Sequence, residues 1–121
     1  MSKRVLIIED DKDIAKILTV RFRAAGFEIR HAEDGLYGVQ QAREFNPDVI
    51  VLDMMLPAGG GLGVLKNLQM SVYSNAVPVI VYSGMQDETR KKEVEELGVA
   101  AYFQKPYDPQ KIVEKAKEII G

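Results

Sequence analysis

Short apolar runs alternate with longer segments of helical period along this chain. The runs cover residues 4–9, 27–32, 48–53, 77–83 and 100–104. Each run is too short for a helix and is therefore read as a strand. The first, third and fourth are apolar at nearly every position, which is typical of strands that are buried on both faces of a sheet. We expect five strands, three of them in the interior.

Five further segments place apolar residues on one helical face. They cover residues 11–25, 35–45, 62–72, 87–97 and 109–120. Asp34 is a candidate cap for the second helix, and Pro109 stands in the first turn of the last one. Strict alternation of strands and helices predicts an α/β fold with a doubly wound, five-stranded parallel sheet and helices on both faces. The common strand order for this flavodoxin-like (βα)5 arrangement is 2-1-3-4-5.

Composition narrows the class of protein. A length of 121 residues, 46% of them apolar and 28% charged, suits one folded domain over residues 1–121. The net charge of -2 supplies no basic field, so we expect no direct binding to nucleic acid. The absence of cysteine excludes thiolate catalysis and disulfides. No apolar run is long enough for a signal peptide or a membrane span, so we expect no membrane association and a cytoplasmic location.

Candidate chemistry lies at the carboxyl ends of the predicted strands. In a sheet of this order, ligands bind at that edge, between strands 1 and 3. The residues at that edge are Glu9, Asp10 and Asp11 after the first strand, Asp53 after the third, Ser83 after the fourth and Lys105 after the fifth. Residues more than ninety positions apart are therefore expected to meet.

These residue types fit one kind of reaction. Clustered carboxylates repel one another unless a hard cation joins them, and oxygen ligands favour Mg2+, with Mn2+ as the other candidate. Asp53 on the middle strand is the natural nucleophile for phosphoryl transfer, with Lys105 and Ser83 as donors to the phosphoryl oxygens. Asp11 is better explained as the cap of the first helix, so we leave it out of the metal site.

The whole chain resembles the receiver domains of two-component response regulators. The matching features, in family order and spacing, are the acidic pair at Glu9 and Asp10, the motif D-x-x-x-P from Asp53 to Pro57 with Gly61 after it, Ser83-Gly84, Tyr102 and Lys105-Pro106. The resemblance implies that Asp53 accepts a phosphoryl group from a histidine kinase or a histidine phosphotransfer protein. It implies a Mg2+ site formed by Glu9, Asp10, Asp53 and the backbone carbonyl of Met55.

The same resemblance implies which residues and which surface change when the domain is phosphorylated. Ser83 and Tyr102 would be the switch residues that change the face formed by the fourth helix, the fifth strand and the fifth helix. The domain would be a phosphorylation switch in phosphorelay signal transduction rather than an enzyme, although it would assist its own phosphorylation and dephosphorylation. The Lys105-Pro106 bond is expected to be cis. The downstream target stays unknown.

Two surfaces of the chain indicate how it binds a kinase and whether it dimerises. The first helix has a second apolar stripe beside its core face, formed by Ile14, Ile17, Val20 and Ala24. By resemblance, a kinase would dock along this stripe and along the loop at Pro106 and Tyr107. Ala100-Ala101 stands where receivers that dimerise to drive winged-helix domains carry acids, so we expect a monomer or a weak dimer.

Three other functions fit this sequence less well. A phosphohydrolase of the haloacid dehalogenase type needs an acid two residues after the nucleophile, where this chain has Met55. A flavin phosphate would be repelled by the acids that follow the first strand. A receiver-like adaptor that is never phosphorylated typically lacks a site residue, and none is missing here. We also expect Met54 and Met55 to pack in the core and His31 to be a surface residue.

Overall fold

A five-stranded parallel sheet forms the centre of the computed structural model, which describes residues 2–57 and 60–121. The strands are β1 (Arg4–Ile8), β2 (Glu28–Ala32), β3 (Val49–Leu52), β4 (Val79–Ser83) and β5 (Ala101–Gln104). Their spatial order is β2-β1-β3-β4-β5, with every neighbouring pair parallel. The predicted order is confirmed.

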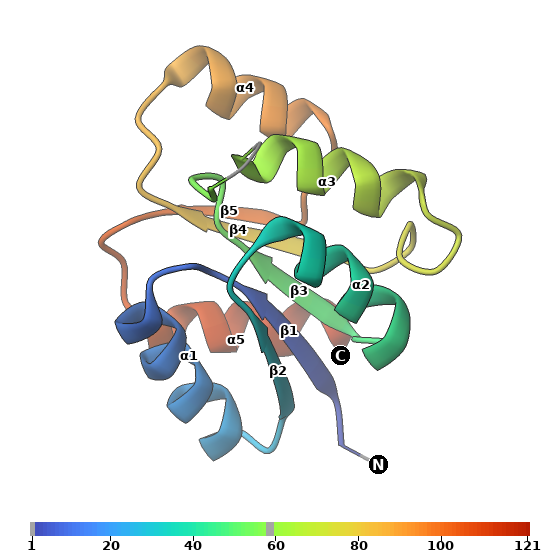
Figure 1. The fold of residues 1–121 in the computed structure, drawn as a ribbon. Coiled ribbons are helices and arrows are strands. Elements are labelled where there is room, and N and C mark those ends of the chain that lie inside the picture. The colour runs from blue at the N-terminus through green and yellow to red at the C-terminus, as the bar shows by residue number, and fades with distance from the viewer. Residues whose placement is uncertain (1, 58–59) are drawn as a thin grey trace.

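Helices cover both faces of this sheet (Figure 1). They are α1 (Lys12–Ala24), α2 (Gly35–Phe45), α3 (Gly60–Met70), α4 (Glu88–Glu96) and α5 (Pro109–Ile120). Helices α1 and α5 share one face, and α2, α3 and α4 share the other. Among the described helices, none is long and apolar enough to cross a membrane.

Two apolar clusters hold the layers together. Alternate residues of β1 point to opposite faces, so Ile7 packs with Phe22 and Ile112 on the α1/α5 side. Ile8 packs with Leu65 and Val94 on the other side. Residues Val5 to Ile8, all of β3 and all of β4 are buried, which matches their unbroken apolar sequences.

Strand register positions the functional edge. Ile8 pairs with Leu52 and Leu52 pairs with Val81, so the chain leaves β1 and β3 at the same level of the sheet. Glu9 and Asp53, the next residue on each strand, are consequently neighbours. The backbone agrees, since the N–H of Asp53 donates to the carbonyl of Ile8 at 3.0 Å.

Helix starts follow the predicted caps at Asp11 and Asp34. The carboxylate of Asp11 accepts from the N–H groups of Asp13 and Ile14 at 2.9 and 3.2 Å, which satisfies two donors that the first helical turn leaves free. Asp34 accepts from the N–H of Tyr37 at 2.8 Å. The interpretation of Asp11 as a cap is confirmed.

Two sequence expectations need correction around β3. Helix α3 begins at Gly60 rather than residue 62. Gly60 takes a φ of +71°, which glycine adopts readily, and the N–H of Gly61 donates to the carbonyl of Met54 at 2.8 Å. Of the glycine-rich patch at residues 58–63, the first two lie outside the described residues. Met54 is buried as expected, but Met55 is 59% exposed, so its predicted core packing is wrong. The chain turns away from the sheet after Asp53, and Met55 falls on the outer side of that turn.

Candidate functional site

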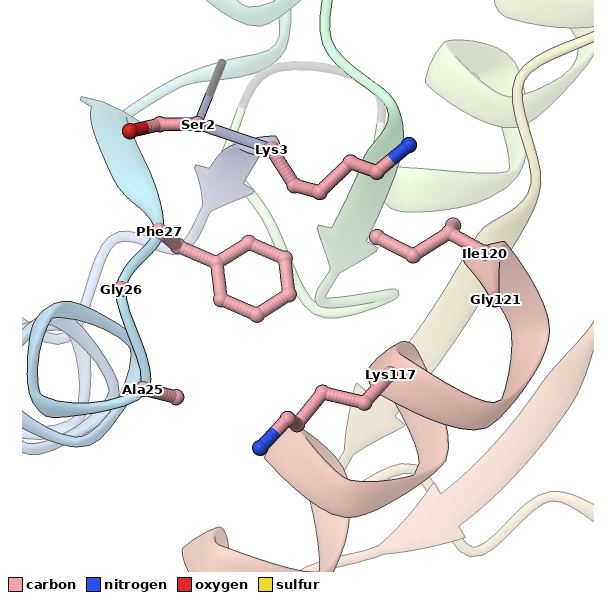
Figure 2. A pocket seen from close by; sticks show the side chains of 8 residues that line it. All are labelled: Ser2, Lys3, Ala25, Gly26, Phe27, Lys117, Ile120 and Gly121. Atoms are coloured by element: carbon pink, nitrogen blue, oxygen red, sulfur yellow. The ribbon is translucent and has the colours of Figure 1, made fainter.

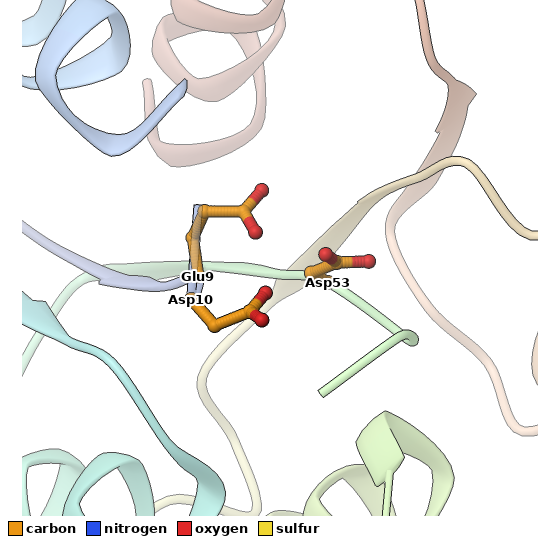
Figure 3. Close-up of side chains that lie close together, drawn as sticks. All are labelled: Glu9, Asp10 and Asp53. Carbon is orange, nitrogen blue, oxygen red and sulfur yellow. The ribbon is translucent and has the colours of Figure 1, made fainter. Parts of the chain in front are cut away.

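Three carboxylates converge where β1 and β3 end. One oxygen from each of Glu9, Asp10 and Asp53 lies within 4.8 Å of the others. Figure 3 shows the side chains of Glu9 and Asp10 directed toward Asp53. Glu9 and Asp53 are only 1% and 4% exposed, whereas Asp10 is exposed. The cluster therefore opens to solvent on the side of Asp10.

Lys105 compensates part of this negative charge. Its Nζ donates to Oε1 of Glu9 at 2.6 Å and to Oδ2 of Asp53 at 3.2 Å. The lysine follows β5, and its N–H donates to the carbonyl of Ser83 at 2.8 Å, which fixes its backbone beside β4. The expected meeting of Lys105 with Asp53 is present, and the closer partner is Glu9. The Lys105-Pro106 bond is cis, as expected.

Burial and hydrogen bonds separate the two inner carboxylates. Burial raises the pKa of Glu9 to about 7, against the opposing hydrogen bond from Lys105, and the neighbouring Asp53 raises it further. Burial also acts to raise the pKa of Asp53, but opposing contacts keep the pKa of this carboxyl below its usual value. The N–H of Met55, which donates to Oδ1 of Asp53 at 2.9 Å, lowers this pKa together with Glu9, Ser83 and Lys105. Asp53 therefore carries its charge at neutral pH, as a nucleophile must.

The donor set fits a magnesium ion. Glu9, Asp10 and Asp53 offer only oxygen atoms, which suits a hard divalent cation better than zinc or copper. Asp10 is the exposed member and leaves the cluster accessible from solvent. One lysine against three carboxylates also leaves room for further positive charge.

Magnesium affinity is expected to depend on pH through Glu9. A carboxyl group with a pKa of about 7 must lose its proton before it binds a cation. We expect the apparent dissociation constant for Mg2+ to be about tenfold higher at about pH 6 than at about pH 8, measured by amide chemical-shift titration. Glu9→Gln should remove this dependence. If the dependence persists in Glu9→Gln, another group causes it.

Ser83 and Tyr102 lie on adjacent strands beside the cluster. Ser83 is fully buried at the end of β4, and its Oγ accepts from the N–H of Met85 at 3.2 Å. This bond uses an oxygen lone pair, so the hydroxyl hydrogen can donate toward Asp53, whose pKa Ser83 helps to lower. Tyr102 pairs with Val81 across β4 and β5. Its buried hydroxyl has no hydrogen-bond partner within the described part of the chain.

The ring of Tyr102 also faces charged residues of α4. The Nζ of Lys91 lies 5.3 Å from the centre of the ring, a distance typical of a cation–π contact. Burial raises the pKa of Tyr102, with further contributions from Glu95, Glu88 and Asp53. The ring is thus placed between the acidic cluster and α4.

Two side-chain contacts were not predicted, one beside the site and one at the far ends of α3 and α4. The Nε2 of His31 lies 2.7 Å from the carbonyl oxygen of Glu9, so this half-buried ring holds the end of β1. The Nε2 of Gln69 donates to the carbonyl of Leu97 at 2.6 Å and ties α3 to the end of α4. The position of His31 at the end of β2, next to β1, was the available signal for the first contact. No sequence pattern indicated the second.

The apolar stripe on α1 is exposed over most of its length. Ile17 and Val20 are 49% and 56% exposed, and Ala24 is exposed as well. Ile14 differs, because it is half-buried and packs against the α1/α5 core cluster. Pro106 and Tyr107 are exposed beyond β5. The backbone carbonyl of Tyr107 accepts from the hydroxyl of Tyr82 at 3.0 Å, which holds this loop in place.

A hollow of about 530 Å3 lies at the opposite edge of the sheet (Figure 2). It is lined by Ser2, Lys3, Ala25, Gly26, Phe27, Lys117, Ile120 and Gly121. These residues precede β1 and β2 or end α5, so the hollow is remote from the carboxylate cluster. No acidic side chain is among these lining residues, and the hollow offers no comparable chemistry.

Comparison with known proteins identifies the family. The family model described as the response regulator receiver domain matches residues 5–117. This chain belongs to that family. The receiver is 31% identical over 120 residues to the phosphate regulon transcriptional regulatory protein PhoB of Escherichia coli, covering 99% of the chain and 52% of PhoB. It is 30% identical over 117 residues to the DNA-binding response regulator MtrA of Mycobacterium tuberculosis, covering 97% of the chain and 50% of MtrA. The receiver thus spans about half the length of these relatives.

Solved structures agree with this assignment. The receiver domain of the Francisella response regulator 1452 is 28% identical, with a TM-score of 0.88 over 98% of this chain and 97% of that one. The receiver domain of the sensor histidine kinase PA1611 from Pseudomonas aeruginosa shares the fold at 20% identity and a TM-score of 0.89, over 100% of this chain and 99% of that one. That structure has a magnesium ion coordinated in its active-site cleft.

The family fixes the broad function of this receiver. Receiver domains of response regulators are signalling switches that histidine kinases phosphorylate, and the acidic cluster is compatible with that role. The alternative interpretation as a phosphohydrolase is not favoured. The family is also expected to bind Mg2+ at its acidic site.

Proposed function

We propose that Asp53 is the phosphoryl acceptor of this receiver and that it takes the group from a phosphohistidine. The observation that carries the proposal is the placement of Asp53. Its carboxylate is 4% exposed, lies at the end of the central strand, contacts Lys105 at 3.2 Å and shares a cluster with Glu9 and Asp10. Of the three carboxylates, Asp53 alone follows the central strand, and its pKa lies below the usual value.

The chain's own residues have separate roles in the transfer. An oxygen of Asp53 forms a bond to phosphorus while the phosphorus–nitrogen bond of the phosphohistidine breaks, and the imidazole leaves with its electron pair. Lys105 neutralises charge on the transferred group, and the N–H of Met55 orients the carboxylate of Asp53. Bound Mg2+, held by Glu9, Asp10, Asp53 and the carbonyl of Met55, would supply the remaining positive charge. The same groups would assist hydrolysis of the aspartyl phosphate.

Ser83 is proposed to report the phosphorylated state. A phosphoryl group on Asp53 adds strong acceptor oxygens, and the hydroxyl hydrogen of Ser83 can move from the carboxylate to one of them. Movement of Ser83 toward the phosphoryl group would open space for the ring of Tyr102, whose buried hydroxyl has no hydrogen-bond partner among the described residues in its present position. Helix α4 can follow because Val94 is its one buried residue within Glu88–Glu96. Gln69 holds only the end of the helix at Leu97.

A phosphoryl mimic is expected to change the α4/β5/α5 face. With Mg2+ and beryllium fluoride, amide chemical shifts should change most between residues 83 and 105, because the switch shifts a population of packings. Ser83→Ala should weaken these changes, and Ser83→Thr, which keeps the hydroxyl, should retain them. If shifts stay within the loops around Asp53, the domain is a phosphate carrier rather than a conformational switch.

The exposed stripe on α1 is proposed as the kinase-docking surface, together with Pro106 and Tyr107. It lies beside the acidic edge and exposes apolar side chains that the fold does not bury. Ile17→Asp should slow transfer from a phosphohistidine donor at least tenfold while leaving phosphorylation by acetyl phosphate unchanged. Met70→Asp is the matched control, because Met70 is exposed at the end of α3 on the other face of the sheet. Equal losses with both donors would contradict docking at this stripe.

A further inference from the structure

A groove between α2 and α3 is used neither by the phosphorylation site nor by the proposed docking and output surfaces. Two adjoining hollows of about 360 and 690 Å3 form it, and both are lined by Leu36 and Val39. The first extends to Gly60 and Gly63, and the second to Tyr73. Helices α2 and α3 lie side by side across the sheet from α1, which carries the kinase-docking stripe (Figure 1).

The groove exposes apolar side chains that have no role in the core. Leu36 is 86% exposed and Tyr73 is 53% exposed. Exposed apolar residues that adjoin a hollow are typical of an interaction surface rather than of an ordinary solvated face. The groove is therefore expected to have an occupant.

The shape of the groove is self-complementary. Leu36 projects at the rim of a hollow that Gly60 and Gly63 line together with the side chains of Val39, Val64 and Asn67. A Cβ added at Gly63 would have no neighbour within 4 Å, so this position is open. A leucine from outside can enter it, and the chain presents such a leucine on the same face.

The charges of the groove are self-complementary as well. Among the residues that line the two hollows, the charged ones are Arg43 and Glu44, which are adjacent and opposite in sign. A two-fold axis parallel to α2 brings residues at the same height together, so Arg43 of each copy would meet Glu44 of the other. The same axis would bring Leu36 of each copy to the other copy's glycine-lined hollow. A net charge of -2 gives little repulsion between copies.

We propose that the α2–α3 groove binds a second copy of this chain in a two-fold symmetric dimer with the two α2 helices parallel. Such an interface is isologous, because one patch supplies both the projecting side chain and the hollow. The contact would involve only the two hollows and the side chains at their rims, so we expect a weak dimer that depends on concentration. The proposed dimer does not require phosphorylation, and it can be tested without it.

Sedimentation equilibrium over about 10 µM to about 1 mM tests the proposal. The expected mass rises from 13.5 kDa toward twice that value. Leu36→Asp should hold the mass at the monomer value, while Leu36→Met should leave the association intact. Gly63→Leu is the decisive variant, because it fills the hollow at a position that is open in the monomer. It should abolish the dimer while the thermal midpoint stays the same or rises. A monomer at every concentration, or a dimer that Gly63→Leu leaves unchanged, overturns the proposal.

Two further variants test the orientation. Arg43→Glu and Glu44→Arg should each weaken association when alone, and an equal mixture should restore it, because opposite charges then face each other again. The chain contains no cysteine, so Gln40→Cys on the same helix can form a disulfide only between copies. Oxidation by air with a copper catalyst should cross-link Gln40→Cys and should leave Lys111→Cys, on α5, monomeric. Cross-linking of Lys111→Cys alone would place the interface elsewhere and contradict the proposal.

Discussion

Asp53→Ala is expected to abolish the Mg2+-dependent mass increase that acetyl phosphate produces. Asp53 is the one residue at the end of the central strand that contacts Lys105 and lies within the carboxylate cluster. The variant removes the nucleophile, while Lys105 keeps its closer partner Glu9 at 2.6 Å and Glu9 loses the neighbouring charge that raises its pKa. We therefore expect a circular-dichroism melting midpoint equal to or above that of the unmodified chain.

The control for this variant is Asp13→Ala. Asp13 is an exposed acid in the first turn of α1 and has no oxygen in the cluster. Its replacement should leave the mass increase intact and alter stability by less than about 1 kcal/mol. A Mg2+-dependent adduct that persists on Asp53→Ala would falsify the assignment of the acceptor.

Gly61→Ala is expected to have the largest effect on folding. A Cβ at this position would overlap the backbone of Asp53 and Met54, whose atoms cannot move aside as a flexible side chain can. The N–H of Gly61 also fixes the start of α3 through its 2.8 Å bond to Met54. We expect a loss of about 1–3 kcal/mol or more in the free energy of unfolding, measured by urea denaturation, and slower phosphorylation because the backbone of Asp53 must shift.

Gly63→Ala in the same helix provides the matched comparison. A Cβ there meets no heavy atom within 4 Å, so the gain in helix propensity is unopposed. This variant should gain about 0.5–1 kcal/mol in stability. If Gly61→Ala and Gly63→Ala change the free energy of unfolding equally, the close approach of Gly61 to the backbone of Asp53 and Met54 is not the reason that residue 61 must be glycine.

The order of strands and helices could be predicted because it depends on the spacing of apolar residues along the sequence. Apolar runs at the strands and helical faces between them determine the layers, and the doubly wound order brings Glu9, Asp53, Ser83 and Lys105 to one edge. Their gathering follows from parallel strands that end at the same level. Motif spacing then indicated the family, which the match over residues 5–117 shows.

Local geometry and side-chain pairing were less accessible to prediction. Helix α3 starts two residues before the predicted position, and an apolar pattern encodes neither the positive φ of Gly60 nor the bond from the N–H of Gly61 to Met54 at that start. Met55 is exposed because the chain turns outward after Asp53. The contact of His31 with the carbonyl of Glu9 and the bond of Gln69 to Leu97 depend on side-chain reach across elements.

The central claim is that Asp53 accepts a phosphoryl group in a Mg2+-dependent reaction. The most direct measurement is the intact mass of the chain after incubation with acetyl phosphate, with Mg2+ and with excess EDTA, followed by peptide mapping of any adduct. We predict a gain of one phosphoryl group with Mg2+, mapped to Asp53, and no gain with EDTA, because three carboxylates without a divalent cation repel the incoming phosphate. An adduct on another residue, an equal gain in EDTA, or no adduct under either condition would contradict the account.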